Sequence, residues 1–267
     1  MALPAVKPPL IKQSWLRAII FALIYYGCLL LVSAMGLPSF IVINSITGIV
    51  LVVVFRQFIE RRKTDFQNLF RKGDEGEILT GFLVGMAIMG LGALILYLHG
   101  NLLWIDSAFN ASDFFNGLGL MLLVAAGEEI VFRGYVLPNL MGSFNQWVAL
   151  GGSALIFAAF HASNPGINVL AIINILLGGL LLGINYLYTR NIWFAVGLHF
   201  AWNFFQGPVL GYQVSGIGLK SILQQQLTGP KMFTGGDFGF EGSIVATGLS
   251  ILALLILYWL YERKYGS

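Results

Sequence analysis

Charged residues and cysteine are scarce in this sequence. Only 10% of its 267 residues are Asp, Glu, Lys or Arg, whereas 57% are hydrophobic. Soluble domains carry roughly a quarter charged residues, so this chain has too few to cover a surface that faces water. The single cysteine, Cys28, excludes an internal disulfide and a cysteine-based metal cluster. The sequence therefore predicts a membrane protein, with the lipid bilayer as one partner.

A polar linker is also missing. No long polar segment divides the hydrophobic sequence into two blocks, so we predict a single membrane domain over residues 1–267. The basic residues are scattered among the loops and form no patch of the kind that binds nucleic acid. Nucleic acid is therefore not an expected partner.

Hydrophobic stretches long enough to cross a membrane recur along the chain. A spanning helix needs about 20 mostly apolar residues. The segments that meet this requirement, or nearly do, are roughly 15–35, 40–58, 78–98, 115–137, 147–163, 168–188, 191–206 and 243–261. The sequence thus predicts an all-α fold, a polytopic membrane bundle of about eight transmembrane helices.

Basic residues fall almost entirely on one side of the membrane if the chain crosses it eight times. That side receives Lys7, Lys12, Arg17, Arg56, Arg61, Arg62, Lys63, Arg71, Lys72, Arg190, Arg263 and Lys264. The other side receives only Lys220 and Lys231. Because cytoplasmic loops carry an excess of Lys and Arg, we predict that both termini are cytoplasmic. The expected location is the cell membrane, or the endoplasmic reticulum membrane in a eukaryote.

The first span ends in Val32-Ser33-Ala34, which looks like a signal-peptide cleavage site. Its apolar stretch exceeds the roughly 7–15 residues of a signal peptide's hydrophobic region. Removing the span would also disturb the sorting of basic residues. We therefore expect an uncleaved helix.

Segment 207–242 is long for a connection and rich in Gly and Gln. A connection of this length without secondary structure is uncommon in a compact domain. We predict an exterior loop, which is either a lid or re-entrant piece or a mobile connection.

Two pairs of glycines lie four residues apart within predicted helices: Gly81 with Gly85, and Gly179 with Gly183. Small residues at this spacing let membrane helices approach closely. We predict that these glycines serve packing rather than chemistry.

The fourth predicted span contains Glu128, Glu129 and Arg133. Each such charge costs about 2.5–3.5 kcal/mol on insertion scales, so charges persist inside membranes mainly where they serve a function. Glu129 and Arg133 are four residues apart and share a helix face. Glu128 is rotated by about 100° from Glu129. We predict that Glu129 pairs with Arg133 while Glu128 is available for proton transfer. The alternative is a purely structural cluster of ion pairs.

Two further spans carry histidines: His161 near the end of the fifth, and His199 with Asn203 on one face of the seventh. Alone, His161 suits an interfacial or satisfied core residue, and the His199–Asn203 pair suits a hydrogen bond to a neighbouring helix. Depth connects them. At 1.5 Å per residue, Glu128, His161 and His199 lie about 16, 21 and 12 Å from the cytoplasmic ends of their spans. We therefore expect them to meet in one buried cavity.

Peptide hydrolysis needs a base that activates water and donors aimed at the developing oxyanion. The sequence has no Gly-x-Ser-x-Gly motif, and Cys28 is far from any histidine. A serine or cysteine nucleophile is therefore poorly supported. A glutamate assisted by histidine can instead activate water directly.

Three motifs together resemble the CPBP family, also called Abi. They are Glu-Glu-x-x-x-Arg at 128–133, Phe-x-x-x-His at 157–161 and His-x-x-x-Asn at 199–203, in a family-like core of residues 115–206. That family includes the type II CAAX prenyl endopeptidases that convert Ras-like proteins.

The resemblance implies an intramembrane glutamic endopeptidase that needs no cofactor. Glu128 would be the general base and His161 would help to activate water. His199 and Asn203 would form the oxyanion hole, with Glu129 and Arg133 in support. The substrate would be a membrane-associated peptide or protein, with or without a prenyl group.

Three other functions use the same residues. A zinc protease would bind metal through His161, His199 and a glutamate, although no His-Glu-x-x-His motif is present and Arg133 would place a positive charge nearby. A non-catalytic immunity or regulatory protein would bind a peptide in the cavity without turnover. A transporter would use the intramembrane carboxylates, but no internal repeat supports it.

Overall fold

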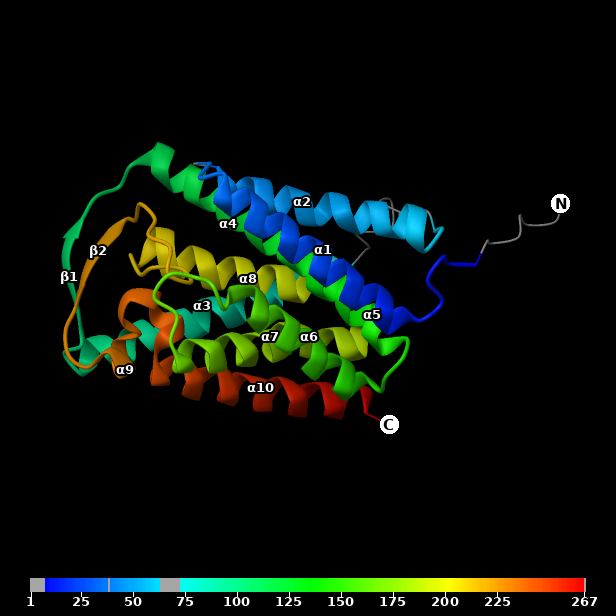
Figure 1. The fold of residues 1–267 in the computed structure, drawn as a ribbon. Helices are drawn as coiled ribbons and strands as arrows, with labels where there is room; N and C mark the ends of the chain where they lie inside the picture. Colours follow the sequence, from blue (N-terminus) through cyan, green and yellow to red (C-terminus); the bar gives the residue numbers. More distant parts are fainter. Residues whose placement is uncertain (1–7, 38, 63–72, 267) are drawn as a thin grey trace.

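The computed structural model describes residues 8–37, 39–62 and 73–266, which form a helical bundle (Figure 1). Four of the basic residues that were used to predict the orientation lie outside the described residues: Lys7, Lys63, Arg71 and Lys72. The helices are α1 (Ser14–Ala34), α2 (Phe40–Val54), α3 (Asp74–Leu98), α4 (Ala111–Val131), α5 (Leu137–Met141), α6 (Gln146–His161), α7 (Val169–Thr189), α8 (Trp193–Phe204), α9 (Lys231–Thr234) and α10 (Ile244–Tyr265).

Each of the eight predicted spans coincides with a helix, which confirms the predicted helical membrane bundle. In the described part of the chain, six helical segments are long and apolar enough to cross a membrane on their own. The other two, α6 and α8, have only 16 and 12 residues. Most of α8 is buried and it packs closely against α3, so protein rather than lipid surrounds it.

The start of α1 and the end of α10 lie at the same end of the bundle, which we call the terminal end (Figure 1). The strands and α9 lie at the opposite end, which we call the distal end. The start of α1 and the end of α10 share one end of the bundle, as expected if the chain crosses the membrane an even number of times. That the terminal end faces the cytoplasm stays a prediction.

Cysteine labelling tests the predicted orientation. In a Cys28→Ser background, Gln224→Cys at the distal end should react with a membrane-impermeant maleimide in intact cells. Gln13→Cys at the terminal end should react only after permeabilisation, because its side should be cytoplasmic. The opposite pattern would show that the predicted orientation is wrong.

The glycine pairs pack helices together, as predicted. A Cβ atom on Gly81 would collide with the backbone carbonyl of Phe194 in α8. A Cβ on Gly179 would lie 2.9 Å from Cα of Ala154 in α6. Backbones therefore approach closely at α3–α8 and α6–α7, and these contacts fix the helices that carry His161 and His199.

A π-helical turn at Phe132–Val136 follows directly on the glutamates of α4. Pro138 has no N–H to donate to the carbonyl of Gly134, four residues earlier. Arg56 supplies the missing donor, with its Nη2 2.7 Å from that oxygen. A second π-turn, Phe205–Val209, contains Pro208 and follows α8. Such turns are frequent at functional sites, but the sequence pattern did not reveal them.

Segment 207–242 is folded, and the sequence analysis missed its strand. β2 (Leu223–Leu227) pairs antiparallel with β1 (Leu102–Ser107), the connection between α3 and α4. The segment also contains α9, and Phe238 and Phe240 are fully buried. Of the two predicted alternatives, the structure agrees with a packed cover at the distal end rather than a loose connection.

Candidate active site

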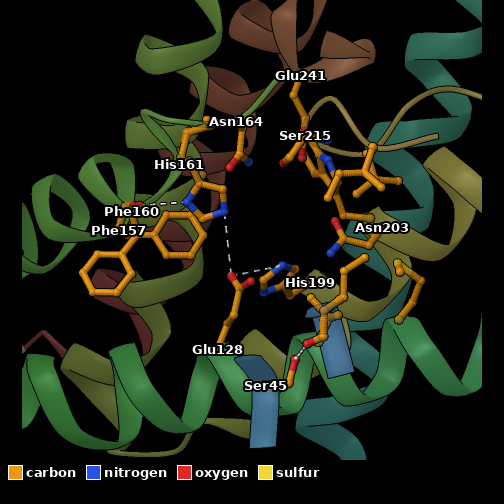
Figure 2. A pocket seen from close by; sticks show the side chains of 18 of the residues that line it. Ser45, Glu128, Phe157, Phe160, His161, Asn164, His199, Asn203, Ser215 and Glu241 are labelled. Atoms are coloured by element: carbon orange, nitrogen blue, oxygen red, sulfur yellow. Dashed lines mark hydrogen bonds and ion pairs between the residues drawn. The ribbon is translucent and has the colours of Figure 1, made fainter. Parts of the chain in front are cut away.

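A cavity of about 210 Å³ lies between the helices, and Glu128, His161, His199 and Asn203 all line it (Figure 2). These residues come from α4, α6 and α8, so the predicted convergence of the three motifs is confirmed. Apolar side chains such as Ile41, Val124 and Leu182 form much of the remaining wall.

The cavity is bordered by loops only at the distal end. Its loop residues are Asn164, Val214, Ser215, Ile217, Leu219 and Glu241. None of the lining residues belongs to a described connection at the terminal end. The loops that border the cavity therefore lie toward the strands and α9 (Figure 1).

Glu128 faces both histidines without a direct hydrogen bond to either. Its Oε2 lies 4.0 Å from Nε2 of His161 and 4.0 Å from Nε2 of His199. Figure 2 shows the carboxylate below the ring of His161 and beside the ring of His199, with a dashed line to each. Hydrogen bonds of this type are usually near 2.9 Å. A water molecule about 2.8 Å from each atom can bridge separations of this size.

The proton of neutral His161 can be assigned from its surroundings. Nδ1 lies 2.8 Å from the carbonyl oxygen of Phe157, one turn earlier in α6. A carbonyl only accepts hydrogen bonds, so Nδ1 must donate. In the neutral ring, Nε2 is then an acceptor directed toward Glu128. Two acceptors therefore face the same point in the cavity.

Glu129 is buried behind the cavity and contacts two partners. Its Oε1 lies 2.9 Å from Nη1 of Arg133, which confirms the predicted pair. The same oxygen lies 2.8 Å from Nδ1 of His199, a contact that the sequence did not predict. Glu129 is fully buried and Arg133 is 1% exposed. Glu129 therefore connects the ion pair to the ring that lines the cavity.

Arg133 and Phe157 connect the motifs to each other. Arg133 Nη2 donates to the carbonyl of Gly179 at 2.9 Å, which ties the π-helical turn after α4 to α7. The guanidinium carbon lies 4.9 Å from the ring centroid of Phe157. That ring lies 4.6 Å from the ring of His161. The phenylalanine of the second motif thus lies against both the histidine and the arginine.

Sequence reasoning missed the loop residues of the cavity, notably Asn164, Ser215 and Glu241. No motif spacing marks them, because they approach the site from connections rather than from a shared helix face. Asn174 of α7 also lines the cavity, and its Nδ2 donates to the backbone carbonyls of Glu241 and Ser243.

The zinc alternative needs three ligands around one point. Glu128, His161 and His199 are the residues that would supply them. In the part of the chain that the structure describes, no group of three or more His, Cys, Asp or Glu side chains is spaced to hold a metal ion. The histidine nitrogens lie 4.0 Å from the carboxylate oxygen. In a tetrahedral zinc site with bonds of about 2.0–2.2 Å, neighbouring ligand atoms are only about 3.4 Å apart.

Comparison with known proteins matches part of the chain to a known family. A search of curated proteins finds no match to this chain. Residues 110–205 match the sequence model of the family described as type II CAAX prenyl endopeptidase Rce1-like. The matched segment runs from the start of α4 through α8 and contains every residue of the three motifs. The resemblance seen in the motifs is thereby confirmed: residues 110–205 of this multi-pass membrane protein match the Rce1-like type II CAAX prenyl endopeptidases, a family of proteases.

Proposed function

We propose that the protein is an intramembrane endopeptidase that hydrolyses a peptide bond with water activated by Glu128. The observation that carries this proposal is the position of Glu128 Oε2, 4.0 Å from Nε2 of both His161 and His199. Among the described residues, none gives this buried oxygen a hydrogen bond. Water held at this point would donate one hydrogen to Glu128 and the other to His161.

The first step is proton transfer. Glu128 takes a proton from the bound water, and the water oxygen attacks the carbonyl carbon of the scissile bond. His161 holds the second hydrogen of the water and thereby orients the oxygen for attack. When the tetrahedral intermediate breaks down, Glu128 returns its proton to the nitrogen of the leaving amine, and the C–N bond breaks.

His199 and Asn203 are the donors available to the oxyanion. Both line the cavity on the same face of α8. Since Nδ1 of His199 already faces Glu129, its Nε2 carries a hydrogen only when the ring is doubly protonated. Glu129 is the counter-ion that such a ring requires. Glu129 would then stabilise two positive charges, that of the protonated His199 ring and that of Arg133.

The substrate we propose is a peptide or protein segment that enters the cavity within the membrane, with or without a lipid group. The walls of the cavity are largely apolar. A segment with apolar residues on both sides of the scissile bond matches these walls. We propose the cell membrane as the location, with the terminal end in the cytoplasm.

The decisive experiment measures peptidase activity of the purified protein in detergent, with membrane-protein and prenylated-peptide substrates assayed side by side. Mass spectrometry should find products that differ from the substrate by one added water. If the wild-type protein binds peptides in the cavity but cleaves none of them, the non-catalytic immunity or regulatory function is favoured.

Metal independence is a separate prediction. A chelator such as 1,10-phenanthroline should leave turnover unchanged, because a carboxylate and a histidine can activate water without a metal. Buffer with added zinc should have no stimulatory effect. Loss of activity with the chelator and recovery with zinc would instead support the zinc protease.

A further inference from the structure

A second carboxylate, that of Glu241, borders the cavity on the side opposite Glu128 (Figure 2). Glu241 lies in the short turn Phe240–Gly242 that precedes α10. Its Oε2 accepts hydrogen bonds from the backbone N and the Oγ of Ser215, at 2.9 and 2.8 Å. Its backbone carbonyl accepts from Asn174 at 2.6 Å. The carboxylate is therefore held in a defined position at the distal side of the cavity.

No basic side chain in the described lining of the cavity neutralises this charge. The lining residues include no lysine and no arginine. The described residues form ion pairs elsewhere, and none of these pairs involves Glu241. Among the described residues, its hydrogen bonds from Ser215 all end on Oε2, which leaves Oε1 for another donor.

A structural role for Glu241 accounts for its position but not for its charge. A glutamine could accept the same two hydrogen bonds from Ser215 through its carbonyl oxygen. An ionised carboxylate beside a largely apolar cavity is costly unless a partner compensates it. A positively charged group on the ligand provides that compensation. Electrostatic attraction is also stronger in a partly desolvated cavity than in bulk water.

We propose that Glu241 forms a subsite for a positively charged group of the substrate, a lysine or arginine side chain near the scissile bond. This inference rests on the proposed peptidase function and names its substrate class. A peptide with its scissile bond at Glu128 extends toward the distal end and presents the cation to Oε1 of Glu241. A free C-terminal carboxylate at the same place is repelled.

Peptides that differ in one charge test the subsite. The test uses sets of three apolar fluorogenic peptides, which carry Lys, Gln or Glu at the same position. A separate set is made for each position that flanks the scissile bond. At one position, the wild-type protein should prefer Lys over Gln by about 10- to 100-fold in kcat/KM, because hydrogen bonds to charged groups have this magnitude. Glu241→Gln should abolish that preference, and Glu241→Lys should favour the Glu peptide.

Asp237→Asn is the matched control, since Asp237 is an acid of the same segment that pairs with Lys231 in solvent, outside the cavity. It should leave the Lys-to-Gln ratio at the wild-type value. An equal loss of the ratio in both variants would point to general surface charge, and an unchanged ratio in Glu241→Gln would overturn the proposal. Melting temperatures check that the variants are folded.

Binding of the same peptides, measured by fluorescence anisotropy, separates this proposal from the proposed function. Selective binding of the Lys peptide that depends on Glu241, without hydrolysis, would support the subsite and contradict the peptidase. Hydrolysis and binding without any preference for charge would support the peptidase and contradict the subsite.

Discussion

Glu128→Gln is expected to lower kcat by about 10²–10⁴-fold, the usual contribution of general acid–base catalysis. Glutamine keeps the size of the side chain but cannot take a proton from water. Because Oε2 of Glu128 has no hydrogen bond to a described residue, its replacement should remove no structural contact. Turnover of a fluorogenic peptide and the melting temperature in detergent should be measured together.

The matched control is Glu75→Gln, in the first turn of α3 at the exposed terminal end. This variant should keep both turnover and melting temperature. Near-normal turnover in Glu128→Gln would show that Glu128 is not the base. A large loss of stability in that variant would show that its carboxylate is structural.

Arg133→Met and Glu129→Gln are each expected to lower the free energy of unfolding by about 3–5 kcal/mol, because each leaves one member of a buried ion pair without its partner. Arg133 is 1% exposed and Glu129 fully buried, so water cannot take the place of the missing charge. The double variant should be more stable than the sum of the single changes predicts. Denaturant or thermal unfolding in detergent gives the coupling energy of the pair.

The activity of these variants separates the two contacts of Glu129. Glu129→Gln removes the counter-ion of His199 as well as that of Arg133, so the double variant should regain stability without regaining turnover. Additive losses of stability would contradict the ion-pair interpretation. Full turnover in the double variant would contradict the role of Glu129 beside His199.

The sequence was sufficient to predict the helices and the different surroundings of the two glutamates. Length and apolar composition locate the helices, because a bilayer requires both. Helical rotation separates Glu128 from Glu129 and pairs the latter with Arg133, and the structure has the same pairing. Helical geometry shows which face of a helix a residue occupies, but it does not show which neighbouring helix packs against that face. The contact between Glu129 and His199 therefore needed the tertiary structure.

The distal end was less predictable. β1 and β2 are short and separated by more than a hundred residues, so no local hairpin signal marks their pairing. Glu241 approaches the cavity from a turn far along the chain from every motif. Its position depends on hydrogen bonds from Ser215 and Asn174, and a sequence pattern does not contain such contacts.

The loops at the distal end set a condition for any substrate that enters between them. Described loop residues border the cavity only at this end, which also carries the strands and α9 (Figure 1). With the terminal end in the cytoplasm, as predicted, these loops face the outer compartment. A substrate that enters between them would be cut only after secretion, and arrest of translocation would leave the precursor uncut although the enzyme is intact.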